Sequence, residues 1–302
     1  MNVLITGAEG QLGQTLLRVL RRESDWSFTA LTRSYLLTAE GPIPVDPLSK
    51  TSWRQALATA NWHPNVIINA AAMTNVDRCE SNREEAWQSN AQLTETVTRI
   101  ARIFDSKVIQ ISTDYVFDGA SGPYIETDKP NPINYYGKTK LAAENICAQS
   151  AVPLAIVRTM WLYGHSIGPK MSFVRWVRQE LSAGRTVNIV SDEFGNPTLL
   201  DDLAYAVFKI IDKNISGIIN VAGEERMSRL EFARGIAEHL ELDSTLISPV
   251  TNAELHRAAP RPLQSGLLTI KAKSLFGLHT RPLKHGLMIT KTLEQREETE
   301  FH

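Results

Sequence analysis

Short apolar runs alternate with stretches of helical periodicity along the first half of the chain. Val3–Ile5 is too short for a helix and a glycine follows it, whereas apolar residues recur at helical intervals from Leu12 to Leu20. The pattern predicts strands at 3–5, 27–31, 43–45, 66–68, 108–112 and 154–157, and helices at 12–20, 87–104 and 136–148. This alternation indicates a parallel sheet with helices on both faces. With right-handed crossovers it becomes a doubly wound, Rossmann-type α/β fold.

The second half of the chain is less regular. It predicts helices at 173–181 and 201–211, strands at 187–190 and 217–221, and a further helix that opens with a capping box at Ser228–Glu231. We therefore expect a dinucleotide-binding Rossmann domain at 1–164 and a smaller, mixed α/β substrate-binding domain at 165–302. Parts of 187–222 are expected to return to the large sheet.

Composition narrows the function classes. The chain has 32 Lys and Arg against 33 Asp and Glu, a net charge of −1 that lacks the basic footprint of nucleic-acid binding. No apolar run approaches the ~18 residues of a membrane helix, and no signal-peptide pattern precedes Val3. Neither the two cysteines nor the histidines have the spacing of a disulfide framework or a zinc site. We expect a cytoplasmic enzyme without a metal, a nucleic-acid partner or membrane contact.

The first strand is followed by a glycine turn, in which Gly7, Gly10 and Gly13 have the spacing GxxGxxG. Glycines there allow a tight turn and let a pyrophosphate approach the backbone N–H groups at a helix N-terminus. The alternative is an ordinary strand-to-helix turn. The strand–turn–helix context favours the dinucleotide site.

The end of the second strand, which contacts the adenosine ribose in Rossmann folds, reads Thr32-Arg33-Ser34. No carboxylate is present to bind a free 2′-hydroxyl, and an arginine with two hydroxyls suits a 2′-phosphate. This favours NADPH over NADH, although NADH use stays open, as does the alternative that Arg33 is a solvated loop cation. Asp46, after the short third strand, either accepts from the adenine amino group or caps a turn.

Two further segments carry candidate chemistry. Tyr136 and Lys140 are four residues apart and share one helix face, where the cation is expected to lower the phenol pKa and make Tyr136 a proton donor or acceptor. Thr113 ends the fifth strand, where ligands bind in open α/β sheets, and its hydroxyl can bond a substrate oxygen. A surface helix and a strand-end turn are the alternatives. Ala70 and Ala71 follow the fourth strand and leave room for a cofactor.

Along the chain, the motifs follow one another as the glycine turn, Asn69-Ala70-Ala71, the strand-end Ser112-Thr113 and the Tyr136–Lys140 pair. In this order they resemble the extended short-chain dehydrogenase/reductase superfamily, and within it the dTDP-4-dehydrorhamnose reductase family. Matching stretches run from residue 1 to about 280; they are 7–13, 69–77, 112–119, 132–140, 158–164, 192–198 and Arg261-Pro262. The resemblance implies NADPH-dependent reduction of the C4 keto group of a nucleotide-activated 6-deoxysugar, typically dTDP-4-dehydro-β-L-rhamnose to dTDP-L-rhamnose. A homodimer is the expected assembly.

The resemblance also implies residue roles. It assigns catalysis to Thr113, Tyr136 and Lys140, and substrate contacts to Thr113, Asp114 and Trp161, with an apolar face of Trp161 toward the sugar. Cofactor contacts carry over to Gly10, Gln11, Leu12, Asp46, Ala70 and Ala71, and Lys140 can also hold the nicotinamide ribose. Two positions depart from the family. Thr15 replaces a glutamate that holds magnesium in some members, and Leu268 replaces an acid in the motif after Arg261-Pro262.

Other functions remain to be weighed on the same fold. A nucleotide-sugar dehydratase or epimerase is one, but dehydratases place a glutamate after the strand-end Thr-Asp, and this chain has Tyr115 there. A non-catalytic, NADP-binding regulatory subunit is another, and the intact Thr113, Tyr136 and Lys140 argue against it. The nucleotide and the C4 stereochemistry are not readable from these motifs.

Overall fold

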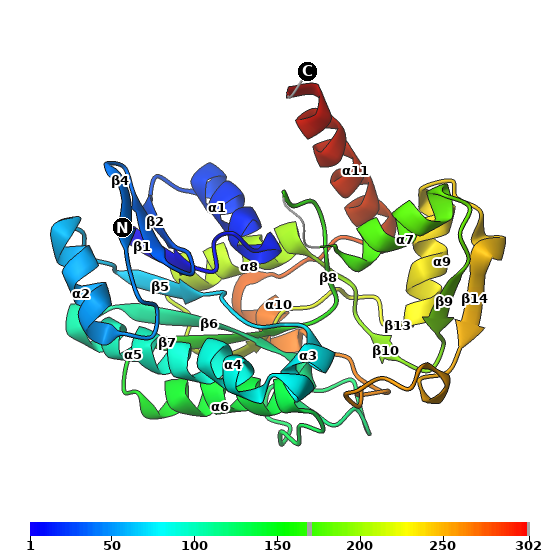
Figure 1. Ribbon diagram of the computed structural model, residues 1–302, viewed down its shortest axis with the longest axis horizontal. Coiled ribbons are helices and arrows are strands. Elements are labelled where there is room, and N and C mark those ends of the chain that lie inside the picture. The colour runs from blue at the N-terminus through cyan, green and yellow to red at the C-terminus, as the bar shows by residue number, and fades with distance from the viewer. Residues whose placement is uncertain (168–170, 301–302) are drawn as a thin grey trace.

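The computed structural model describes residues 1–167 and 171–300, with side chains as far as Gln295. An eight-stranded sheet forms its centre, in the order β12-β7-β6-β5-β1-β2-β3-β4 (Figure 1). The strands are β1 (Asn2–Thr6), β2 (Ser27–Leu31), β3 (Tyr35–Thr38), β4 (Gly41–Pro44), β5 (Val66–Asn69), β6 (Lys107–Thr113), β7 (Leu154–Thr159) and β12 (Gly217–Asn220). The strands from β12 to β2 pair in parallel, which confirms the predicted doubly wound sheet.

One edge of the sheet differs from the prediction. β3 was not predicted, and the expected third strand at 43–45 is the antiparallel partner β4, so both run as a hairpin beside β2. Only three residues, 32–34, separate β2 from β3. A connection of that length cannot make a parallel crossover, so the chain turns back on itself.

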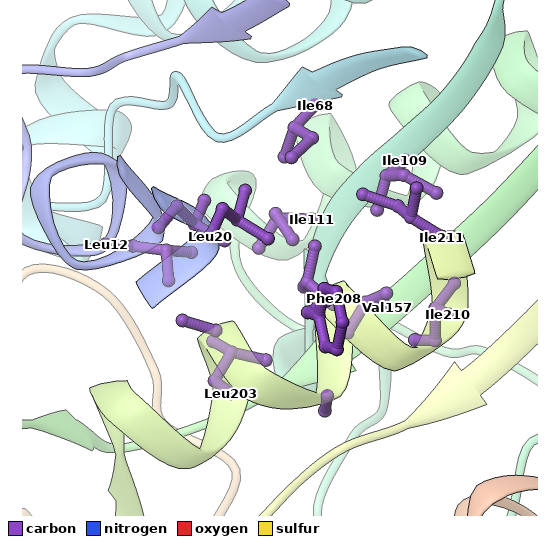
Figure 2. Packing of buried hydrophobic residues seen from close by; sticks show 14 of the residues in the cluster. Leu12, Leu20, Ile68, Ile109, Ile111, Val157, Leu203, Phe208, Ile210 and Ile211 are labelled. Atoms are coloured by element: carbon purple, nitrogen blue, oxygen red, sulfur yellow. The ribbon is translucent and has the colours of Figure 1, made fainter. Parts of the chain in front are cut away.

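Each inner strand is buried on both faces because its residues alternate between two helical layers. Val3 and Ile5 of β1 pack on the side of α1 (Gln11–Glu23) and α8 (Leu200–Asp212), the cluster shown in Figure 2. Leu4 packs on the opposite side, with α2 (Lys50–Thr59), α5 (Leu93–Phe104) and α6 (Tyr135–Gln149). Figure 1 shows the two layers above and below the sheet.

The helix predicted at 87–104 is broken into pieces. Beyond α3 (Val76–Ser81) the chain forms α4 (Arg83–Trp87), a π-helical segment at Gln88–Gln92, and then α5. The π segment carries Asn90, which is buried and bonds both backbone groups of Met73 and the hydroxyl of Thr139 on α6. This departure from regular helix therefore ties α6 to the loop after β5.

Apart from the core on the two faces of the sheet, a second hydrophobic cluster joins elements at the end of the molecule opposite α2 (Figure 1). It joins α7 (Phe173–Ser182), α9 (Arg229–His239), α11 (Leu283–Glu300) and the parallel pair β9 (Val187–Val190) and β14 (Ile247–Val250). Two-residue strands connect it to the sheet: β8 (Leu162–Tyr163), β10 (Phe194–Gly195), β11 (Thr198–Leu199) and β13 (Met227–Ser228). The capping box predicted at Ser228–Glu231 is present and opens α9.

The later part of the chain also returns to the large sheet. α8 covers one face of the sheet, and β12 extends the sheet beside β7. Ala272 of α10 (Ile270–Phe276) packs into the cluster between the sheet, α1 and α8. The parallel strands β5, β6 and β7 end at one edge, and Trp161, just after β7, packs against the second cluster. The candidate site therefore lies between the sheet edge and that cluster.

Candidate active site

The glycine turn between β1 and α1 packs against the end of β5. A Cβ atom on Gly7, where φ is +67°, would come within 2.7 Å of the backbone of Ala71 and 3.0 Å of Ala70, and one on Gly13 within 2.2 Å of the Gly7 carbonyl oxygen. α1 begins after Gly10 without a side-chain cap. A bare helix N-terminus beside a backbone-only surface is the arrangement that holds a phosphate group, so these residues fit the pyrophosphate of a dinucleotide.

The two remaining residues of the turn contribute differently. The side chain of Leu12 is buried in the core beneath α1, so only its backbone can reach a cofactor. Gln11 is half-buried at the first position of the helix. Leu12 can therefore serve a cofactor only through its backbone, and the contact expected of Gln11 stays a prediction.

The segment 32–34 forms the tight turn of the edge hairpin. The Thr32 hydroxyl accepts from the backbone N–H groups of Ser34 and Tyr35, at 3.4 and 3.1 Å, so its oxygen is committed to the turn. Arg33 and Ser34 are exposed, and no described side chain pairs with the Arg33 guanidinium. Asp46 caps a turn by accepting from the Leu48 N–H at 2.9 Å. Of the four, Arg33 is thus the group most available to a ligand.

Thr113, Tyr136 and Lys140 come together beneath the site. Thr113 is the last residue of β6, and Tyr136 lies in the first turn of α6, which Asn134 caps by accepting from the Gly137 N–H. Lys140, one turn further, donates from Nζ to the Ile111 carbonyl of β6 at 2.7 Å. The Thr113 hydroxyl lies close enough to Tyr136 to lower the pKa of its phenol, and it donates its own proton to the Asp114 carboxylate at 3.1 Å.

The protonation of Tyr136 differs from the expectation. Burial raises the pKa of Tyr136 above its usual value, and the nearby Thr113 hydroxyl offsets this only in part. Burial also lowers the pKa of Lys140 to about 8, although Glu144 opposes that shift. The expectation that Lys140 lowers the phenol pKa is therefore wrong for this structure, because burial dominates and the lysine is bonded to Ile111. Tyr136 is a neutral phenol, the form that donates a proton.

Asp114 is fully buried behind Thr113. Its carboxylate accepts from the hydroxyls of Ser265 at 2.7 Å and Thr113 at 3.1 Å, and burial raises its pKa to about 6. A substrate that contacts Asp114, as expected, would therefore bind a carboxylate that already accepts two hydrogen bonds from within the chain. Ser265, from the C-terminal part, was not predicted as a partner.

A buried ion pair lies behind the three candidate catalytic residues. Arg158 of β7 makes two hydrogen bonds to Glu144 of α6, at 3.0 and 2.7 Å, and Ser112 donates to the same carboxylate at 2.5 Å. Arg158 is 1% exposed. Glu144 lies one turn after Lys140 on α6. Its bonds to Ser112 and Arg158 therefore connect the ends of β6 and β7 to the helix that carries Tyr136 and Lys140.

Trp161 lies where the sheet meets the second cluster and is half-buried there. The Arg229 guanidinium lies 3.7 Å from the ring centroid, and Phe232 stacks in parallel at 6.4 Å. A Cβ atom on Gly195 would come within 2.7 Å of the indole, so glycine is required there. The Arg229 guanidinium thus covers part of the ring. A contact between Trp161 and a sugar stays a prediction, and packing between the two parts of the chain is its alternative.

Three functional candidates escaped the sequence reading. Asn90 lies in a π-helical segment whose sequence resembles that of a regular helix, so its spacing did not single it out. Glu144 follows Lys140 by four residues on the same helix, and this spacing could have indicated that the two side chains are neighbours. Arg229 is the first residue of α9, directly after the capping serine. The capping box therefore fixed where the helix begins and could have marked Arg229 as a residue at the tip of an element.

The comparisons with known proteins agree with this geometry. The profile of the RmlD substrate-binding domain family matches residues 1–295. The chain belongs to this family. It is accordingly an oxidoreductase of the extended short-chain dehydrogenase/reductase superfamily.

Relatives of this RmlD-family chain include proteins named as reductases. It is 34% identical to a dTDP-4-dehydrorhamnose reductase of Mycobacterium tuberculosis over 289 residues, covering 94% of this chain and 89% of the relative. It is similar to a crystal structure of dTDP-4-dehydrorhamnose reductase from Bacillus anthracis in complex with NADP, with a TM-score of 0.86, 29% identity and coverage of 96% and 98%. A dTDP-glucose 4,6-dehydratase from the same species, 17% identical with a TM-score of 0.81 and coverage of 99% and 98%, shares the fold.

Two further observations concern what else the RmlD-family chain could bind. None of the described helices has the length and apolar character needed to cross a bilayer. Within residues 1–167 and 171–300, no three His, Cys, Asp or Glu side chains are grouped to hold a metal ion. Thr15, at the position of a metal-binding glutamate in some relatives, is buried and donates its hydroxyl to the Gln11 carbonyl.

Proposed function

We propose that this protein reduces the C4 keto group of a nucleotide-activated 6-deoxysugar with NADPH, converting dTDP-4-dehydro-β-L-rhamnose to dTDP-L-rhamnose. The observation that carries the proposal is the grouping of Thr113, at the end of β6, with the neutral phenol of Tyr136 in the first turn of α6 and with Lys140 one helical turn further, bonded to Ile111 of β6. Reduction of a ketone creates an alkoxide, and a neutral phenol beside a hydroxyl is suited to protonate and stabilise it.

In the proposed reaction, Tyr136, Thr113 and Lys140 have different roles. The cofactor, when bound, supplies the hydride to C4. Tyr136 donates its proton to the oxygen as charge develops there, and Thr113 holds that oxygen by a hydrogen bond. We expect Lys140, an ammonium one helical turn from Tyr136, to hold the nicotinamide ribose when the cofactor is bound.

The cofactor choice rests on the glycine cradle and on Arg33. The backbone-only surface at Gly7 and Gly13 fits a dinucleotide, and the exposed guanidinium of Arg33 at the end of β2 suits a 2′-phosphate. The NADP complex of the Bacillus anthracis relative supports the same choice. NADH use is expected to be weaker because no carboxylate faces the ribose.

Dehydration and epimerisation are less well supported. The residue after Asp114 is Tyr115, whose ring lies edge-on to Tyr136 at 5.7 Å and offers no carboxylate for elimination. A regulatory subunit would bind NADPH without consuming it.

The test is NADPH oxidation across a panel of nucleotide 4-keto-6-deoxysugars, with product stereochemistry read by NMR. We expect turnover, with the highest kcat/KM for the dTDP sugar. NADPH binding without oxidation on any member of the panel would favour the regulatory role and contradict the proposal.

A further inference from the structure

Arg229 occupies a place at the site that none of the catalytic residues accounts for. It begins α9, and its guanidinium stacks on Trp161 at 3.7 Å and on Phe173 at 4.7 Å. Its charge interacts with Asp114 and Tyr115, the two residues that follow Thr113. Arg229 therefore faces the catalytic wall from the opposite side.

The acids around Arg229 are already engaged. Glu193 bonds Arg257 and the Asn252 side chain, and Asp114 bonds Ser265 and Thr113. Among the residues that the structure describes, no carboxylate forms an ion pair or hydrogen bond with the Arg229 guanidinium. Burial lowers the pKa of Arg229, and the neighbouring charge of Arg257 lowers it further.

This situation differs from that of other arginines near the site. Arg158 is paired with Glu144, and Arg261 with Asp77. A cation withdrawn from water costs free energy unless an acid or a hydrogen-bond acceptor compensates it. Stacking on an aromatic ring covers the flat faces of a guanidinium but leaves its N–H groups, which lie in its plane, able to donate sideways.

We infer that Arg229 binds the diphosphate of the nucleotide-sugar substrate, with Trp161 as the platform that fixes its guanidinium. The inference rests on the proposed function, because the diphosphate is the part of that substrate that carries negative charge. A planar fork of N–H donors matches phosphoryl oxygens in pairs. Trp161 is then a positioning residue that acts through Arg229, and the apolar contact with the sugar first expected of it is not needed.

The direct test is calorimetric binding of dTDP alone, without a sugar, to the full chain. We expect Arg229→Gln to weaken dTDP binding roughly 10–100-fold while the Kd for NADP⁺ stays unchanged. Arg229→Lys should fall between, because it keeps the charge but loses the paired donors. Arg234→Gln is the matched control: Arg234 is exposed on the same helix, and this variant should bind dTDP like the wild type.

The platform role of Trp161 needs a double-mutant cycle. Trp161→Leu should weaken dTDP binding in the wild type but have little further effect in the Arg229→Gln background, because the ring acts through the guanidinium. Additive effects would show that Trp161 contacts the ligand itself and would overturn its role as a platform.

Three outcomes overturn the inference or separate it from the proposed function. If Arg229→Gln leaves both the dTDP Kd and the KM for the sugar unchanged, Arg229 does not bind the diphosphate. Equal losses of dTDP and NADP⁺ binding, with a lowered Tm, would show a structural role instead. If the wild type reduces no 4-keto sugar but binds dTDP in an Arg229-dependent way, the inference stands and the proposed reaction is wrong.

Discussion

The two walls of the site differ in how their charges are paired. On the wall formed by β6 and α6, Lys140 is bonded to Ile111, and Glu144 behind it is bonded to Arg158 and Ser112. On the wall formed by α9, the Arg229 guanidinium has aromatic neighbours, and no acid among the described residues forms an ion pair with it. Paired buried charges hold a scaffold in place, whereas a cation without a bonded acid keeps N–H donors for a ligand. Changes on the first wall should therefore affect kcat or stability, and changes on the second should affect binding.

The largest effect is expected from Tyr136→Phe. Removing the phenol hydroxyl deletes the proton donor, and general acid catalysis is typically worth ~10²–10⁴-fold. Because the proton is needed only as alkoxide charge develops, the loss should appear in kcat rather than KM. Steady-state kinetics and an NADPH titration check this together. A near wild-type kcat would remove Tyr136 from its assigned role.

Arg158→Met should be the most destabilising of the arginine changes. It leaves the buried Glu144 carboxylate without its counter-ion, which costs about 3–5 kcal/mol in the free energy of unfolding. Arg229→Met is the matched control; it deletes an unpaired cation and should change stability by about 1 kcal/mol or less. Urea denaturation of both variants measures the difference. Similar losses for the two would mean that the walls do not differ as described.

Arg33 extends the comparison to the cofactor. Like Arg229 it has no described acid partner, but it is exposed at the end of β2. Arg33→Ala should weaken NADPH binding roughly 10–100-fold, the value of charge-assisted hydrogen bonds to a 2′-phosphate, and leave NADH binding almost unchanged. Fluorescence titration with both cofactors checks this. Equal weakening of both would indicate stacking on adenine rather than phosphate recognition.

The smallest effect concerns pH. Since the pKa of Lys140 is about 8, its positive charge is present below that pH and lost above it, so kcat/KM for reduction should fall as pH rises through about 8. Glu144 raises the pKa of Lys140, and Glu144→Gln should therefore move this alkaline limb to lower pH. Glu238→Gln, an exposed change on α9, serves as the control. A limb that stays in place in Glu144→Gln would show that Lys140 does not set it.

Local spacing was enough to single out Thr113, Tyr136 and Lys140, which the structure brings together, whereas burial and long-range contacts were not visible in it. The strand-end position of Thr113 and the four-residue interval from Tyr136 to Lys140 each follow from a few neighbouring residues. Whether the pKa of Tyr136 is raised or lowered depends on how deeply its phenol is buried, and the four-residue spacing carries no information on burial. The contact between Trp161 and Arg229 joins distant segments. β3 was missed although residues 35–37 are apolar, because residues 32–34 were interpreted as the end of the second strand and not as a hairpin turn.

The most direct test of the proposed reaction follows the hydride itself. The wild type is incubated with dTDP-4-dehydro-β-L-rhamnose and NADPH carrying deuterium at its transferable position, and the product is analysed by NMR and mass spectrometry. The account predicts dTDP-L-rhamnose with one deuterium at C4, formed in proportion to the NADPH oxidised. NADPH that binds but is not consumed, or a product labelled at a carbon other than C4, would contradict it.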